Sequence, residues 1–179
     1  GLGDVYKRQQ FSDKIDEQIY KREDTVNYLD KVISEYISAA LATPNLNVNI
    51  SQALSSYYLM LVDIERISDY AVNMNHQATK RLQGDMTISE IEIVEHMKKL
   101  CVDMKNDLDD VEEAERKDDV IDSLVSSWRE AQIQALKQKK CSSEVSMMLS
   151  RIFTDFERIN DHALNVSQEL DKITVEIPD

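Results

Sequence analysis

The chain has 179 residues, a formal net charge of −13, and only three glycines and two prolines. Its length allows a substantial core, and its acidic surplus disfavours nucleic acids and anionic membrane surfaces, which proteins bind through clustered lysine and arginine. The scarcity of glycine and proline leaves few positions for tight turns and predicts an almost entirely helical fold.

Five segments show the periodicity of amphipathic helices, with apolar residues recurring at alternating intervals of three and four. The first helix is expected to end before Pro44 and the second before Gly84, and Thr87 with Glu90 forms a capping box that starts the third. The opening GLGDVYKRQ, residues 1–9, has no helical face, and we expect it to be an appendage that is not native to the protein. The expected helices span about 10–43, 51–82, 87–108, 110–140 and 143–172.

The dodecamer DIERISDYAVNM at 63–74 returns, 92 positions later, as DFERINDHALNV at 155–166. The same offset carries the apolar stripe of the second helix onto that of the fifth, and an offset of 95 relates the first helix to the fourth. A match across two consecutive helices predicts a duplicated helical hairpin. If the third helix belongs to the duplicated unit, repeat one at 10–84 lacks its first helix and repeat two at 87–172 is complete, the two forming one domain. The predicted core stripes of repeat one are Val26, Leu29, Ile33, Tyr36 and Ala40 on the first helix and Ile64, Ile67, Ala71, Met74 and Ala78 on the second.

Each copy of the dodecamer carries two acids at positions i and i+4, which share one helix face and point away from the apolar stripe. The partner helix of each hairpin has acids beside its own stripe, so two antiparallel helices could together offer several oxygen ligands to a hard cation. A solvated acidic face is the alternative interpretation, because pairs at this spacing also arise by chance in a chain with 34 acids. The candidate ligands are Glu23, Glu65 and Asp69 in the first hairpin and Asp118, Asp122, Glu157 and Asp161 in the second.

The segments ERISDYAVN and ERINDHALN resemble the duplicated signature of PhoU domains, whose E(D)xxxD motifs bind metal clusters on the surface of a helical bundle. The resemblance covers 10–172 and implies an all-α PhoU-like bundle of about five long antiparallel helices with a tandem helical-hairpin repeat. It also implies that the seven acids above ligate a divalent or trivalent cation, either Fe, Mn, Mg or Zn. Ser68 and Asn160 stand where the family usually has glycine, and Asn27 stands where an acid would complete the first site. The first site is therefore one negative charge short.

A longer stretch around the second copy, which begins WREAQIQALKQKK, resembles the PhoU-related tail of bacterial sodium/phosphate cotransporter proteins. This resemblance implies a non-catalytic, cytoplasmic regulatory domain for phosphate uptake, at the inner membrane and preceded by a membrane-embedded transporter segment in the same polypeptide. A homodimer is a further candidate assembly. The alternatives are a free-standing PhoU-type regulator of high-affinity phosphate transport and signalling, and a helical scaffold that binds no metal.

Enzymatic chemistry finds little support in the sequence. No Glu-x-x-His pair of the kind that di-metal bundles use is present, and the three histidines are scattered along the chain. Gly84 is the only interior glycine, which excludes a glycine-rich phosphate loop. Cys101 and Cys141 form neither a disulfide framework nor a CxxC metal motif, which favours a reducing compartment. No apolar run approaches the roughly 20 residues of a membrane span.

Overall fold

The computed structural model describes residues 2–81 and 88–176 and, within those ranges, most side chains between positions 13 and 173. The described residues form five helices and no strand, which confirms the predicted all-α class. The cap expected at Thr87 and the stop expected at Gly84 lie outside the described residues. The helices are α1 (Leu2–Leu41), α2 (Val48–Arg81), α3 (Ile88–Asn106), α4 (Val111–Lys137) and α5 (Ser143–Glu176).

The first helix begins earlier than the sequence pattern indicates. The helix was expected to begin near residue 10, but α1 starts at Leu2 and runs without interruption through that position. The expectation is wrong for the backbone because extending an existing helix adds a hydrogen bond for each residue ordered, even where the residues have no apolar face.

Local capping explains where the later helices begin. The side chain of Asp110 accepts a hydrogen bond of 3.1 Å from the amide of Glu113 at the start of α4. The hydroxyl of Ser142 accepts one of 3.2 Å from the amide of Val145 at the start of α5. Each cap satisfies an amide that the first turn of a helix leaves without an internal partner.

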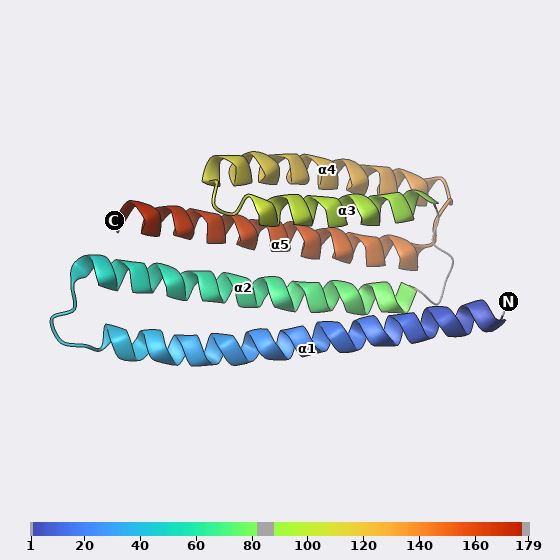
Figure 1. Cartoon of the computed structure of the whole chain (residues 1–179). Coiled ribbons are helices and arrows are strands. Elements are labelled where there is room, and N and C mark those ends of the chain that lie inside the picture. Colours follow the sequence, from blue (N-terminus) through green and yellow to red (C-terminus); the bar gives the residue numbers. More distant parts are fainter. Residues whose placement is uncertain (1, 82–87, 177–179) are drawn as a thin grey trace.

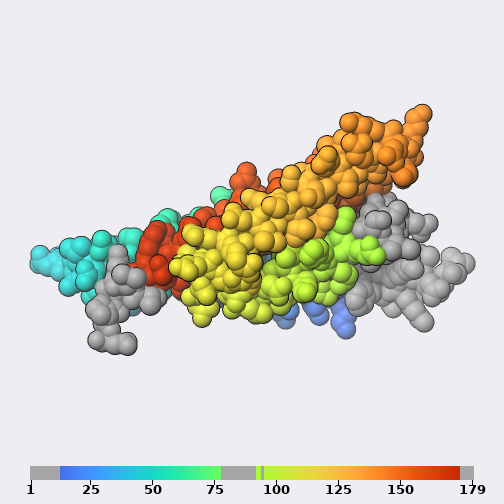
Figure 2. Space-filling view, turned by 90° about the horizontal axis from the view of Figure 1, so that it is seen from above, coloured from blue at the N-terminus to red at the C-terminus, as the bar shows by residue number. Residues whose placement is uncertain are grey.

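The helices form two antiparallel hairpins, α1 with α2 and α4 with α5, that meet through α2 and α5 at the centre of an elongated bundle (Figure 1). Within the part of the chain that the structure describes, α1 packs on α2 alone, on the outer side of the bundle (Figure 1). α3 lies on the opposite side and packs against α5 and α4. Figure 2 shows α3 (green) beside α4 (yellow to orange). None of the described helices combines the length and the low charge content that crossing a bilayer requires.

The main core lies where α3 covers the second hairpin. Its centre is formed by Ile121 and Val125 of α4 with Phe153 and Phe156 of α5, all at most 1% exposed. Trp128 of α4 packs on these aromatic rings and meets His96 of α3 edge to face, with ring centroids 5.6 Å apart. A smaller cluster around Met60, Val166 and Ile173 joins α2 to α5.

The first hairpin buries its predicted core stripes only in part: Ile67 and Met74 of α2 pack against the main core, whereas other members are exposed, and the side chain of Ala78 lies outside the described residues. Leu29, Ile33 and Tyr36 of α1 are 46%, 36% and 73% exposed, and Ile64 of α2 is 43% exposed. The prediction of burial is wrong at these positions because, among the described helices, only α2 packs on α1, and none covers the face that α3 covers in the second hairpin.

Candidate metal centre

Three of the predicted ligands converge on the second hairpin. Asp118 and Asp122 are one turn apart on α4, and Asp161 faces them from the antiparallel α5. Each of the three contributes a carboxylate oxygen, and these oxygens all lie within 4.8 Å of one another. Among the residues whose side chains are described, this aspartate triad is the only such group of three potential metal ligands.

The aspartate triad is under electrostatic stress. Burial and the neighbouring charges of Asp122, Asp161 and Asp119 raise the pKa of Asp118 to about 6. Burial, followed by the charges of Asp161 and Glu157, also raises the pKa of Asp122. A positive ion at this point would relieve the mutual repulsion that causes part of both shifts.

One buried carboxylate oxygen indicates whether the aspartate triad is suited to a cation. Oδ1 of Asp118 is inaccessible to solvent and has no hydrogen-bond partner among the described residues, although buried acceptors are normally paired. An all-carboxylate donor set suits Mg, Mn or Fe, whereas zinc sites in proteins are built mainly from cysteine and histidine. The residues therefore fit a hard cation with oxygen ligands.

The fourth predicted ligand of this site, Glu157, is engaged elsewhere. Its Oε2 accepts a hydrogen bond from Nη2 of Arg129 at 2.5 Å. The same guanidinium donates to Oγ1 of Thr154 at 3.0 Å and to the backbone carbonyl of Ser150 at 3.3 Å. Sequence reasoning missed Arg129, although its position seven residues after Asp122 puts both on one face of α4.

The first hairpin shows a looser arrangement of its candidates. Burial and the charge of Asp69 are the main causes that raise the pKa of Glu65. Both carboxylates lie 3.8 Å from the exposed side chain of Arg66. Glu23 is half-buried on α1, but the described side chains place no third carboxylate, histidine or cysteine close enough to share a cation with Glu65 and Asp69. Asp30, which sequence reasoning overlooked, also raises the pKa of Glu65.

The repeated arginines pair locally. Arg66 and Arg158, which follow the glutamate in the two copies of the dodecamer, each pair with an acid of their own helix. Nη1 of Arg158 lies 3.3 Å from Oδ2 of Asp161, and its side chain is 58% exposed. Residues at i and i+3 are neighbours on one helix face, so the Arg158 side chain can pair with Asp161 without extending to another helix.

The repeated dodecamer also joins the two halves of the molecule. Asp63, the first residue of the first copy, accepts hydrogen bonds through Oδ1 from Nδ1 of His162 at 2.7 Å and from the amide of Asn165 at 3.2 Å. Tyr70 stacks on the His162 ring, with centroids 5.8 Å apart. The dodecamer therefore has two uses, because some side chains face the partner helix of the hairpin and others cross to the opposite repeat.

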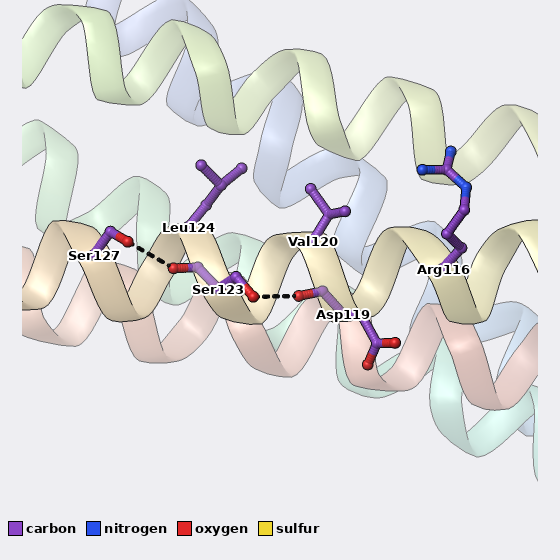
Figure 3. A pocket seen from close by; sticks show the side chains of 6 residues that line it. All are labelled: Arg116, Asp119, Val120, Ser123, Leu124 and Ser127. Carbon is purple, nitrogen blue, oxygen red and sulfur yellow. Dashed lines mark hydrogen bonds between the residues drawn. The ribbon is translucent and has the colours of Figure 1, made fainter.

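A hollow of about 450 Å³ runs along α4 (Figure 3). Val120 and Leu124 supply its apolar side, and the hydroxyls of Ser123 and Ser127 are turned back to the carbonyls of Asp119 and Ser123. These hydroxyls are already engaged by their own helix. The hollow is lined by no member of the aspartate triad.

Comparison with known proteins accounts for both the repeat and the fold. The model of the PhoU domain family matches residues 4–78 and, a second time, residues 88–170. The chain belongs to the PhoU family. This PhoU chain is also 24% identical, over 165 residues, to the phosphate-specific transport system accessory protein PhoU homolog 1 of Thermotoga maritima. The alignment covers 86% of this chain and 70% of that protein.

Proposed function

We propose that this PhoU-family chain is a non-catalytic regulatory protein of phosphate uptake. The observation that carries the proposal is the match of the family model to both halves of the chain, each ending in a helix with the repeated acidic motif. The similarity to a protein named as an accessory to phosphate-specific transport supports the same role.

The finer proposal is that the chain acts at the cytoplasmic face of the inner membrane, as a domain of a sodium-dependent phosphate transporter. The stretch from WREAQIQ through the second acidic motif, which resembles the tail of such transporters, supports it. A free-standing regulator is the second candidate, favoured by the similarity to the Thermotoga accessory protein. The coding sequence upstream of residue 1 separates the two, because membrane spans there support the transporter domain and their absence supports the free-standing protein.

The aspartate triad is the proposed means of regulation. Asp118, Asp122 and Asp161 would hold a hard cation, which supplies positive charge between two helices that otherwise repel each other at this point. Holding it would tie α4 to α5 and stiffen the face that meets the membrane-embedded transporter segment or a second copy of the chain. The first hairpin would contribute a weaker site through Glu65 and Asp69 alone.

Mn²⁺ titration tests the cation site directly. We expect about 1 mM Mn²⁺ to raise the melting temperature of the wild-type chain by several degrees, since a ligand at 100 times its dissociation constant stabilises by about 2.7 kcal/mol. Amide hydrogen exchange in α4 and α5 should slow in the same samples. The variant Asp118→Asn/Asp122→Asn should lose both responses and serves as the control.

A chain that melts and exchanges identically with and without Mn²⁺, Mg²⁺ or Fe²⁺ would instead support a helical scaffold whose acids only keep it in solution. Regulation of uptake needs a separate measurement. Sodium-dependent uptake of radioactive phosphate should change in cells whose transporter polypeptide carries Asp118→Asn/Asp122→Asn in place of the wild-type domain.

A further inference from the structure

We propose that Arg129 is an internal competitor for Glu157, which holds this carboxylate away from the aspartate triad and sets how tightly the site takes a cation. The inference rests on the proposed cation site and concerns its regulation.

The Arg129 side chain is held in place on the α4–α5 surface by several groups of α5. Its guanidinium meets the Glu157 carboxylate, the Thr154 hydroxyl and both the carbonyl and the hydroxyl of Ser150. It also lies over the ring of the fully buried Phe153, 5.9 Å from the centroid. Several donors of one planar group are therefore used at once, and this pre-organised fork distinguishes the contact from a mobile surface ion pair.

Glu157 stands between two competing partners. On one side it is paired with Arg129, and on the other its charge helps to raise the pKa of Asp122. The antiparallel helices explain this position, because Glu157 lies one turn before Asp161 on α5 and Arg129 lies two turns after Asp122 on α4. The carboxylate is close enough to the aspartate triad to interact with it but is neutralised by an arginine.

Charge counting gives the direction of the effect. Cation affinity rises with the number of charged ligands, so a site of three aspartates is weaker than one that Glu157 joins. Arg129 lowers the affinity in two ways, since it occupies Glu157 and adds a positive charge beside the site. By linkage, a cation that recruits Glu157 must weaken the Arg129–Glu157 pair by the same factor.

Repeat one supplies an internal comparison. With the offset of 95 that relates α1 to α4, the position of Arg129 corresponds to Ser34. Among the described side chains, the cation paired with Glu65, the counterpart of Glu157, is the exposed Arg66 of its own helix at 3.8 Å. The competing arginine is therefore present in the hairpin where three carboxylates converge and absent from the hairpin where they do not.

The test measures the dissociation constant of Mn²⁺ by calorimetry or electron paramagnetic resonance for the wild type, Arg129→Gln, Glu157→Gln and the double variant. We expect Arg129→Gln to bind Mn²⁺ about tenfold more tightly than the wild type, within the usual range of coupling between two sites. In the Glu157→Gln background the same substitution should change the constant by about threefold or less, because the contested carboxylate is gone. An equal effect in both backgrounds would overturn the proposal and leave only a general charge effect.

Arg158→Gln is the matched control. It also removes a positive charge beside a member of the aspartate triad, but from an exposed side chain that is paired with Asp161. We expect a gain of about threefold or less, since exposed ion pairs are screened by water and salt. A gain equal to that of Arg129→Gln would contradict the proposal.

A spectroscopic readout on the wild-type chain does not depend on the variants folding. Addition of Mg²⁺ should shift the nitrogen resonance of the Arg129 side chain as the guanidinium loses Glu157, while that of Arg116, whose partner Glu113 lies outside the aspartate triad, stays unchanged. An unmoved Arg129 resonance in a chain that binds Mg²⁺ overturns the competition alone. If neither the wild type nor Arg129→Gln binds any cation, the proposed cation site itself is wrong.

Discussion

The environment of Asp118 disfavours the charged form of its carboxyl group. Its carboxylate is desolvated, faces like charges and keeps one oxygen without a partner among the described residues. Removing water from a charged group and placing similar charges beside it both favour the protonated form. The result is a group whose folded state holds its proton more tightly than the unfolded chain does.

This shift predicts a dependence of stability on pH. Asp118 has a folded pKa of about 6, and the unfolded value is about 3.9. Between these values the folded state binds more protons, so the contribution of Asp118 to the free energy of unfolding falls as the pH rises and is most unfavourable above pH 6. With chelator present, Asp118→Asn should be more stable than the wild type at pH 7 by about 1 kcal/mol, a figure reduced to allow for solvent screening.

Urea unfolding at pH 4 and pH 7 measures this difference. The gain should shrink towards zero at pH 4, where the aspartate of the wild type is protonated in the folded state. Glu130→Gln, an exposed acid on the same helix, should change stability little at either pH. A variant Asp118→Asn that is less stable than the wild type at pH 7 without metal would contradict the electrostatic account.

At the scale of helices, the same amphipathic pattern has two different outcomes. α4 and α5 bury their apolar stripes because α3 completes a three-helix core over them. α1 and α2 carry stripes at equivalent positions, yet most of the exposed large apolar side chains of the described residues belong to these two helices. A helical period therefore identifies the side that seeks burial, while burial itself requires a covering element.

Equivalent positions in the two hairpins should consequently tolerate truncation differently. Phe156 is fully buried, whereas Ile64, 92 positions earlier, is 43% exposed. We expect Phe156→Ala to cost about 3–5 kcal/mol, because it removes a large buried ring and leaves a cavity. Ile64→Ala should cost about 1 kcal/mol or less, because much of its surface already meets water. Urea unfolding of both variants measures the contrast, and equal losses would show that Ile64 is covered in solution.

At the scale of the molecule, α2 and α5 hold the two repeats together. Their contact combines the apolar cluster around Met60 and Val166 with the polar link from Asp63 to His162 and Asn165. Apolar contact between helices tolerates sliding better than a directional hydrogen bond does, so the polar link specifies the register of one repeat on the other.

A double-mutant cycle measures this link between the repeats. Asp63→Asn and His162→Gln should each destabilise the chain, and together they should lose about 1 kcal/mol less than the sum of the single losses. Asp155 is the counterpart of Asp63 in the second copy and has a pKa raised by burial. Asp155→Asn should therefore be neutral or slightly stabilising at pH 7. Additive losses for the first pair would show that Asp63 and His162 act independently.

Much of the architecture follows from local patterns in the sequence. Helical periodicity, the caps at Asp110 and Ser142, and the two acidic dodecamers depend on neighbours within about four residues, so the sequence alone indicates five helices and a duplicated hairpin. The meeting of Asp118 and Asp122 with Asp161 was also predictable. A short connection makes α4 and α5 antiparallel neighbours, and both helices carry acids at i and i+4 beside their apolar stripes.

Tertiary structure decided the features that depend on how separate helices pack on one another. The pairing of Arg129 with Glu157 requires the axial offset of α4 against α5, which spacing within one helix does not specify. The link from Asp63 to His162 requires the two repeats to dock, and the exposure of Leu29, Ile33 and Ile64 depends on which face α3 covers. The sequence determines which face of each helix is apolar and which is polar, because periodicity is a property of one helix. Which faces meet is settled by the packing of helices that lie far apart in the chain.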